Sequence, residues 1–353
     1  MKNRLKITMI CLMAFFALSC EPENETIEEH PISAEIQEIP VTQDYLVGAL
    51  YLANKWGYNQ EEVPLAGEYE IGNAEAMKQH VEWAAAGGVD FFMFSFREAG
   101  NSQDVSMIEA FQANNAEGTM KFSLRLNIGP FDLEADNTLE DQGRVEDLIT
   151  IFKGMIPFFE DPNYQKIDEK YLVSIIGAHN FHCNDLQEVY RQIREAMSAE
   201  GYELYLLGEQ GNGWVPPARF EMFYENALDA VSFTTMFNDN YYDRYSSFPQ
   251  YLDLHWDYSK EYYMNSVGGV EWVPTVAPAF NPLIAKPEST SYRHVRDDQR
   301  FKDVLNVAKK NIGPSRLIIV NSFNDWEDDT QLEPAESYGT STLDILKQQT
   351  KVN

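Results

Sequence analysis

The sequence predicts a single (β/α)₈ barrel, the TIM-barrel architecture, with loop insertions. From Tyr45 onward, short apolar runs alternate with amphipathic stretches, which is the pattern of βα units that close a parallel sheet. The last run, Leu317–Val320, is continuously apolar, as expected of a strand that is buried on both faces. About eight strand–helix units fit a barrel better than a doubly wound sheet, and the chain contains no G-x-G-x-x-G motif.

The apolar runs define the expected strands. They are Tyr45–Leu52, Val89–Phe96, Lys121–Leu126, Tyr171–Ile176, Leu204–Leu207, Ala230–Phe233, Val273–Val276 and Leu317–Val320. One helix is expected to start at a cap on Asn73, to bury Met77 and Val81, and to end at Gly87. Further helices are expected at roughly Asp141–Phe159, Leu186–Ala199, Pro249–Asn265 and Gln299–Lys310.

The N-terminus is typical of an exported protein, and we predict a lipoprotein signal peptide over residues 1–19. A cationic start precedes the apolar run Ile7–Leu18, which is too short to span a bilayer comfortably. The tetrapeptide Ala17–Cys20 resembles a lipobox, in which the chain is cut before the cysteine and Cys20 receives the lipid. The alternative is an ordinary secretory signal, in which Cys20 has no role.

Residues 20–43 are predicted to be an acidic flexible tether, and residues 44–353 the barrel domain. The tether is rich in Glu and Pro and has little to bury. Its acidic patch resembles the signal that sends some Bacteroidetes lipoproteins to the outer face of the outer membrane; a solubilising linker is the alternative. We therefore expect a cell-envelope protein that is lipid-anchored to the outer membrane.

Charge and aromatic content narrow the class of ligand. The net charge of −29 repels phosphate backbones and anionic lipid surfaces, so we expect no nucleic acid partner and contact with membrane only through the lipid anchor. Neutral glycans are compatible with this charge. The chain has 6 Trp and 19 Tyr, and some of these rings can stack on sugars, although most should fill the core.

The polar segment after Leu317–Val320 is the strongest candidate for chemistry, because active sites of barrels lie at the carboxyl ends of the strands. Glycosidic cleavage needs one protonated and one ionised carboxyl group. In a turn, Asp325 and Asp328 would lie within about 7 Å of each other, and repulsion beside Trp326 would raise one pKa. The alternatives are an acidic surface loop or a calcium loop, although the spacing does not match an EF-hand.

The same segment also carries a family resemblance. Ser322–Pro334 resembles the motif S-[FYW]-N-E-W-x-E-G-T-x-[IL]-E-P of glycoside hydrolase family 99 and its WbsX-like relatives. Weaker similarities occur in Ala49–Leu52, His80–Phe96 and Pro274–Asn281, so that the resemblance extends from about Tyr45 to Leu346. It implies a (β/α)₈ barrel. It also implies endo-acting α-mannosidase activity that retains configuration and uses the sugar's own 2-hydroxyl as nucleophile.

The resemblance also implies roles for residues. Asp325 takes the place of the glutamate that deprotonates the 2-hydroxyl, and Asp328 that of the glutamate that protonates the leaving oxygen and then activates water. Asn324 and Trp326 would shape the pocket, and Glu333 would help to fix the loop. Both catalytic positions are one methylene shorter than in the motif, and an aspartate replaces the glycine that follows the second of them.

Four further residues are candidates for binding substrate. The alternative for Glu209 is a residue on the rim of the barrel, and for His179 it is loop packing. Tyr51 ends the first expected strand, Glu209 and His179 follow other strands, and Trp214 lies in a later loop. The segment His179–Cys183 offers two imidazoles and a thiol that could bind zinc, but no second cluster completes a site. We expect no metal and no cofactor.

These observations together predict a cell-envelope glycoside hydrolase that acts on an α-linked, mannose-containing polysaccharide or glycan. Its partners would be the polysaccharide or oligosaccharide substrate and other polysaccharide-utilisation proteins. The alternative is a non-catalytic surface glycan-binding lipoprotein whose site has degenerated. A third possibility is a role in polysaccharide assembly, but a sugar-nucleotide donor is not expected outside the inner membrane.

Overall fold

The computed structural model describes residues 35–53, 62–70, 72–115, 117–211, 224–237 and 247–352. Within these ranges the strands are β1 (Leu46–Tyr51), β2 (Phe91–Phe96), β3 (Lys121–Asn127), β4 (Lys166–Ile167), β5 (Lys170–Ile176), β6 (Leu204–Gln210), β7 (Ala230–Phe233), β8 (Glu271–Val273), β9 (Thr275–Val276) and β10 (Leu317–Val320). The helices are α1 (Ala74–Ala86), α2 (Ser102–Asn114), η1 (Gly129–Phe131), α3 (Val145–Lys153), α4 (Ile156–Phe159), η2 (Ala178–Asn180), α5 (Leu186–Ala199), α6 (Phe248–Ser266), α7 (Asp298–Lys310) and α8 (Ser341–Thr350). Strands and helices alternate along most of the chain, as βα units require.

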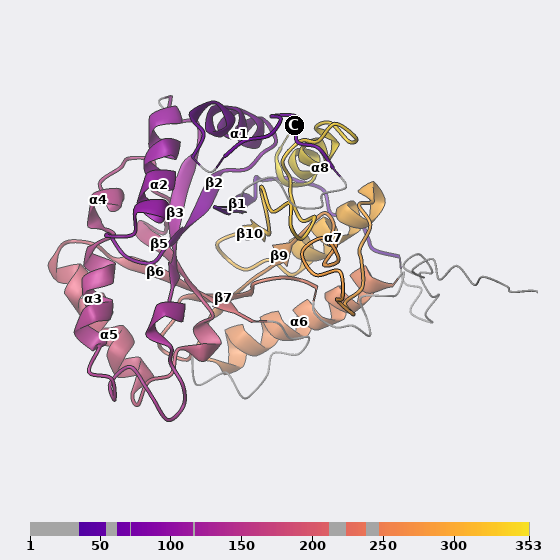
Figure 1. Cartoon of the computed structure of the whole chain (residues 1–353). Helices are drawn as coiled ribbons and strands as arrows, with labels where there is room; N and C mark the ends of the chain where they lie inside the picture. Colours follow the sequence, from indigo (N-terminus) through magenta and orange to yellow (C-terminus); the bar gives the residue numbers. More distant parts are fainter. Residues whose placement is uncertain are drawn as a thin grey trace, which may run out of the picture.

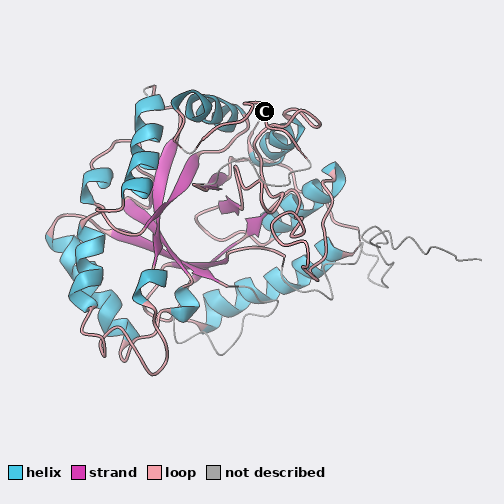
Figure 2. Ribbon diagram, viewed as in Figure 1, coloured by secondary structure: helices cyan, strands magenta, loops and turns pink. Residues whose placement is uncertain are grey.

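The strands form a parallel barrel with helices around it (Figures 1 and 2). The hydrogen-bonded order is β8-β7-β6-β5-β3-β2-β1-β10-β9, and β4 adds an antiparallel hairpin to β5. β8 and β9 are successive parts of one barrel strand, which Pro274 interrupts. Proline has no N–H to give to the ladder, but its carbonyl still accepts from Ile319 N at 3.0 Å. When β8 and β9 are counted as one strand, the barrel has eight parallel strands in the described residues. The predicted fold is therefore confirmed.

Side-chain alternation divides the core into two layers. Inward-facing residues such as Leu50, Phe91 and Leu207 fill the barrel, while Ala49 and other outward-facing residues pack against the helices. The Phe91 ring leaves no room for a neighbouring side chain, because a Cβ at Gly48 would lie 2.4 Å from its Cζ. The interior is therefore a packed core, and substrate chemistry belongs to the end of the barrel.

The local signals that predicted α1 are confirmed. The side chain of Asn73 accepts a hydrogen bond from Ala76 N at 3.0 Å, and the helix ends at Gly87. Met77 and Val81 are buried against the strands. Within the described ranges, no helix combines the length and the apolar character that crossing a bilayer requires.

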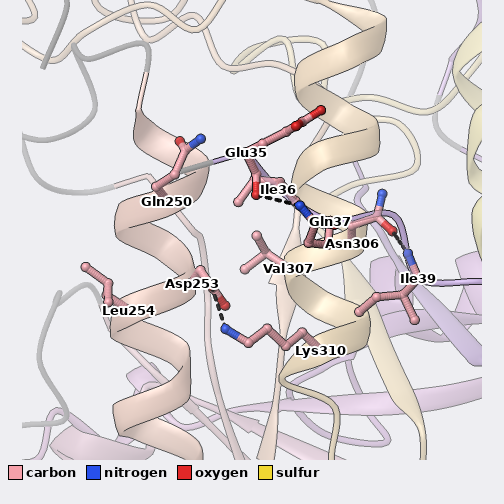
Figure 3. Close-up of a pocket in the computed structure, with 10 residues that line it drawn as sticks. All are labelled: Glu35, Ile36, Gln37, Ile39, Gln250, Asp253, Leu254, Asn306, Val307 and Lys310. Atoms are coloured by element: carbon pink, nitrogen blue, oxygen red, sulfur yellow. Dashed lines mark hydrogen bonds and ion pairs between the residues drawn. The ribbon is translucent and has the colours of Figure 1, made fainter. Parts of the chain in front are cut away.

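The expected tether enters the described part of the chain at Glu35, and from there it packs against α7 (Figure 3). Ile39 N donates to Asn306 Oδ1 at 2.8 Å, and Ile39 O accepts from Lys309 Nζ at 2.7 Å. Lys309 also donates to Gln349 Oε1 in α8 at 2.6 Å. The segment borders a cavity of about 430 Å³ between α6 and α7. The last residues assigned to a flexible tether are thus part of the packed domain.

Candidate active site

The loop after β10 is closed by hydrogen bonds between its two arms. Ser322 N donates to Thr330 O, Leu332 N donates to Ser322 O, and Glu333 N donates to Phe323 O, at 2.8–3.1 Å. These bonds bring residues eight to ten apart in sequence side by side. The segment between them, which carries the carboxylates, is therefore a compact turn.

Asn324 fastens this turn to the end of β1. Its Oδ1 accepts from Leu52 N at 2.8 Å and its Nδ2 donates to Leu52 O at 2.9 Å. Within the turn, Ser322 Oγ accepts from Asp325 N at 2.7 Å. Asn324 is 1% exposed, so the structure makes it an anchor of the loop, and its proposed contact with substrate stays a prediction.

Asp325 and Asp328 lie close together on this anchored turn. Asp325 Oδ1 accepts from Glu327 N at 3.1 Å and from Asp328 N at 3.4 Å. Burial raises the pKa of Asp325 to about 7, and repulsion by Asp328 contributes to the rise. Burial and the nearby Glu327 also raise the pKa of Asp328, although Lys286 opposes this. The turn thus holds two interacting carboxyl groups that exchange protons more readily near neutral pH than ordinary aspartates do.

Glu333 ties the far arm of the loop to three other parts of the fold. Its Oε2 accepts from Tyr69 OH at 2.7 Å and from Trp326 Nε1 at 2.8 Å, while His80 Nε2 lies 3.0 Å from its Oε1. His80 Nδ1 in turn lies 2.8 Å from Tyr51 OH. Glu333 and His80 are fully buried. This network of hydrogen bonds agrees with the expectation that Glu333 fixes the loop.

Two residues predicted to bind substrate lie inside this network. Tyr51 faces the helix layer, where its ring packs on Phe92 and Phe94, because strand alternation directs it away from the barrel interior. Trp326 is 2% exposed, and its N–H is used by Glu333. Both rings are thus held within this network, which positions the loop after β10, and the expected contacts of Tyr51 and Trp326 with a sugar stay predictions.

The residue after Asp328 stands where the family motif has a glycine, and its backbone explains that glycine. Asp329 has φ +55°, the left-handed region in which glycine is favoured and aspartate is among the better tolerated residues. Its Oδ1 accepts from Arg296 Nη2 at 3.2 Å. Asp297, the neighbour of Arg296 in sequence, caps α7 by accepting from Arg300 N.

Glu209 lies near the end of β6 and not beyond a strand as expected, and His179 follows the neighbouring strand β5 at the same end of the barrel. Glu209 is 2% exposed and accepts from Arg125 Nε at 2.8 Å and Arg125 Nη2 at 2.6 Å. His179 Nδ1 accepts from Gly211 N at 2.9 Å, and its side chain is partly exposed. Their roles in substrate binding stay predictions. The ion pair to Arg125 was not predicted, although a charged residue inside an apolar run could have suggested it.

Other predicted residues cannot be placed. Trp214 and Cys20 lie outside the described residues. Among the residues that are described, no three His, Cys, Asp or Glu side chains gather in a way that could hold a metal ion. Burial and nearby carboxylates raise the pKa of Cys183 well above its usual range, which makes its thiol a poor nucleophile or ligand.

Solved structures resemble this fold. A glycoside hydrolase-like protein has a TM-score of 0.84 and 27% sequence identity over 91% of this chain and 98% of its own. The family 99 endo-α-mannosidase from Bacteroides thetaiotaomicron, solved with bis-tris-propane, has a TM-score of 0.62 and 13% identity over 87% of this chain and 96% of its own. A second structure of that enzyme has a TM-score of 0.58, 13% identity and 82% coverage of both chains. The chain is thus a glycoside hydrolase-like TIM barrel, and the family 99 likeness is one of fold.

No curated protein matches the chain in sequence. The family described as "Glycosyltransferase WbsX" matches residues 55–346. This range contains the barrel strands after β1 and the loop that follows β10, including Ser322–Pro334. It therefore agrees with the resemblance found in the motif. Since the match covers most of the chain, the protein belongs to the WbsX family.

Proposed function

We propose that this protein is a glycoside hydrolase of family 99 type that cleaves an α-linked, mannose-containing polysaccharide or glycan. The observation that carries the proposal is the pair Asp325 and Asp328, two interacting carboxyl groups with raised pKa values at the carboxyl end of β10. The rigid anchoring of their loop through Asn324 and Glu333 supports it, because catalytic groups must be held accurately.

The mechanism follows the roles that the family resemblance implies. Asp325 takes the proton of the sugar 2-hydroxyl, and the oxygen attacks the anomeric carbon as the glycosidic bond breaks. Asp328 gives its proton to the departing oxygen. It then removes a proton from the water that opens the three-membered ring, while Asp325 returns its proton to the 2-oxygen. The raised pKa of Asp328 favours the protonated form that an acid needs, and the pKa of about 7 lets Asp325 act as a base at and above neutral pH.

Product release from a glycan panel tests this proposal. The mature protein would be incubated with α-mannans, N-glycan oligosaccharides and plant polysaccharides, beside Asp328→Asn, and the products separated by chromatography. Discrete oligosaccharides from one substrate, absent with the variant, would support the hydrolase. Binding of one polymer without product would instead favour the non-catalytic glycan receptor, in which the shorter aspartates no longer reach the substrate.

Glycosyl transfer is a second candidate because the family description names a glycosyltransferase. A transferase would use a nucleoside diphosphate sugar as donor, whereas a hydrolase uses water as acceptor. The same panel with GDP-mannose added distinguishes them. Lengthened oligosaccharides that appear only with this donor would favour transfer, and shortened ones formed without it would favour hydrolysis.

Activity is expected to depend on the ionisation of Asp325. The base must be ionised, and its pKa is about 7, so kcat/KM should fall as pH drops through about 7. An ordinary aspartate would place this limb near pH 4. The pH profile of kcat/KM measures it, and an acidic limb that stays near pH 4 would contradict the assignment.

We also propose that the protein is lipid-anchored through Cys20 in the cell envelope, on the outer membrane. Cys20→Ser should release the protein from the membrane fraction in cells and abolish labelling by radioactive palmitate. Cys183→Ser serves as a control, because it makes the same chemical change at a cysteine of the barrel domain and leaves the lipobox intact. Equal membrane recovery of the Cys20 variant and the unmodified protein would refute the anchor.

A further inference from the structure

A layer of polar side chains lies directly above the apolar filling of the barrel. On most barrel strands, the residue two positions after an inward-facing apolar residue is polar. Because side chains alternate along a strand, this polar residue also faces inward. Examples are Ser174 after Leu172 and Glu209 after Leu207. The full layer consists of Ser95, Arg125, Ser174, Glu209, Ser232, Thr275 and Asn321. The layer lies toward the carboxyl ends of the strands, beneath the end that carries Asp325 and Asp328.

The charged members of this layer form one buried ion pair. Arg125 on β3 reaches past β5 to hold both oxygens of Glu209 on β6, at 2.6 and 2.8 Å. Ser174 is the register partner of Arg125, and Ser232 is that of Glu209. The hydroxyls of these two serines are buried and have no hydrogen-bond partner among the described residues. Polar groups without a partner thus surround the pair.

Stability does not explain this arrangement. A buried ion pair often contributes no more than a well-packed apolar pair of similar volume, because both charges lose their hydration. Buried hydroxyls that lack partners carry a further cost. A layer with these features is more typical of a site whose hydrogen bonds are completed by a ligand.

We infer that Arg125 and Glu209 form a subsite that recognises hydroxyl groups of a neutral sugar, an inference that rests on the proposed function. Each Glu209 oxygen uses one lone pair for Arg125 and retains another that can accept from a sugar hydroxyl. Arg125 Nη1, which makes no hydrogen bond within the described ranges, can donate to the same sugar. Adjacent hydroxyls on one ring match this pairing of acceptor and donor.

The charges around the pair select against acidic sugars. Arg125 is already neutralised by Glu209, and a sugar carboxylate or sulfate would also be repelled by Asp325 and Asp328, whose negative charge Lys286 offsets only in part. The net charge of −29 acts in the same direction. The subsite should therefore favour uncharged hexoses and require their hydroxyls to be unsubstituted.

Binding, measured without turnover, tests the inference. In the Asp328→Asn background, the double variant Arg125→Met/Glu209→Leu replaces the ion pair with apolar side chains of similar volume, which should preserve folding. Calorimetry with yeast α-mannan, soluble starch and polygalacturonate should show that it binds the preferred neutral polymer about 10- to 100-fold more weakly than the background. Arg125→Lys, which keeps one charged hydrogen bond, should lose less affinity.

The exposed ion pair Lys153–Glu200 provides a matched control, because Lys153→Gln/Glu200→Gln removes two charges far from the site. This control should bind like the background. Unchanged affinity in the Arg125→Met/Glu209→Leu variant, or tighter binding of polygalacturonate than of either neutral polymer, would overturn the inference. Failure of the hydrolase proposal is a separate result, since it would appear as no product release from any glycan of the panel, or as product release that Asp328→Asn does not change.

Discussion

Asp328→Asn is expected to lower kcat by about 10²- to 10⁴-fold. An amide neither gives a proton to the leaving oxygen nor takes one from water, whereas Asp328 is proposed to do both. Asp325→Asn should cause a loss of similar size because it removes the base. Chromatography of oligosaccharide products, with the substrate identified from the panel, measures both rates. Full activity in both variants would remove the pair from the mechanism.

Two controls show whether such a loss is catalytic. Glu327→Gln removes the carboxylate between the pair and should leave most of the turnover. Asp325→Asn should also melt above the unmodified protein at pH 8 and approach it toward pH 4. The folded-state pKa of Asp325 is about 7, above its unfolded value, so the folded protein loses stability as pH rises from about 4 to 7. A variant that melts lower at pH 8 would point to structural damage.

Glu333→Gln is expected to lower the free energy of unfolding by about 2–4 kcal/mol. The carboxylate accepts from Tyr69 and Trp326 on one oxygen and faces His80 on the other, all of them buried. An amide presents N–H groups on one side, so at least one buried donor loses its acceptor. Unfolding in urea, followed by circular dichroism, measures the change.

Glu336→Gln is the matched control, because Glu336 lies three residues later and is exposed. It makes the same chemical change where water can satisfy the amide, and its effect on unfolding should be small. The folded fraction of Glu333→Gln should also show a reduced kcat, since Trp326 lies between the two catalytic carboxylates. Equal stability of the two variants would mean that the network does not hold the loop.

The sequence predicts the barrel well because its strands are apolar runs of the right length. Val273–Val276 was expected as part of one barrel strand, and it is one, although Pro274 divides that strand into β8 and β9. The β4–β5 hairpin was not predicted. Its two-residue turn, Asp168-Glu169, has both φ values positive, at +50° and +63°, yet lacks the Asn or Gly that normally marks such a turn. The helices α2 and α8 were not predicted either, and α2 shows little contrast between an apolar and a polar face.

The candidate site was predictable only where its residues are contiguous. Asp325 and Asp328 share a motif, so their proximity follows from local chain geometry. Glu333 and His80 are 253 residues apart, and Arg125 and Glu209 are 84 apart. Contacts over such separations depend on strand order and register, which a single chain's residue pattern does not specify.

The two hydrogen bonds that Lys309 donates have a mechanical consequence. Lys309 binds the carbonyl of Ile39 near the beginning of the domain and the side chain of Gln349 near its end. Tension applied through the residues before Glu35 would load these two hydrogen bonds before it reached β1. The outer helices α7 and α8 would therefore resist a pull on the start of the chain, and the strands beneath Asp325 and Asp328 would keep their register.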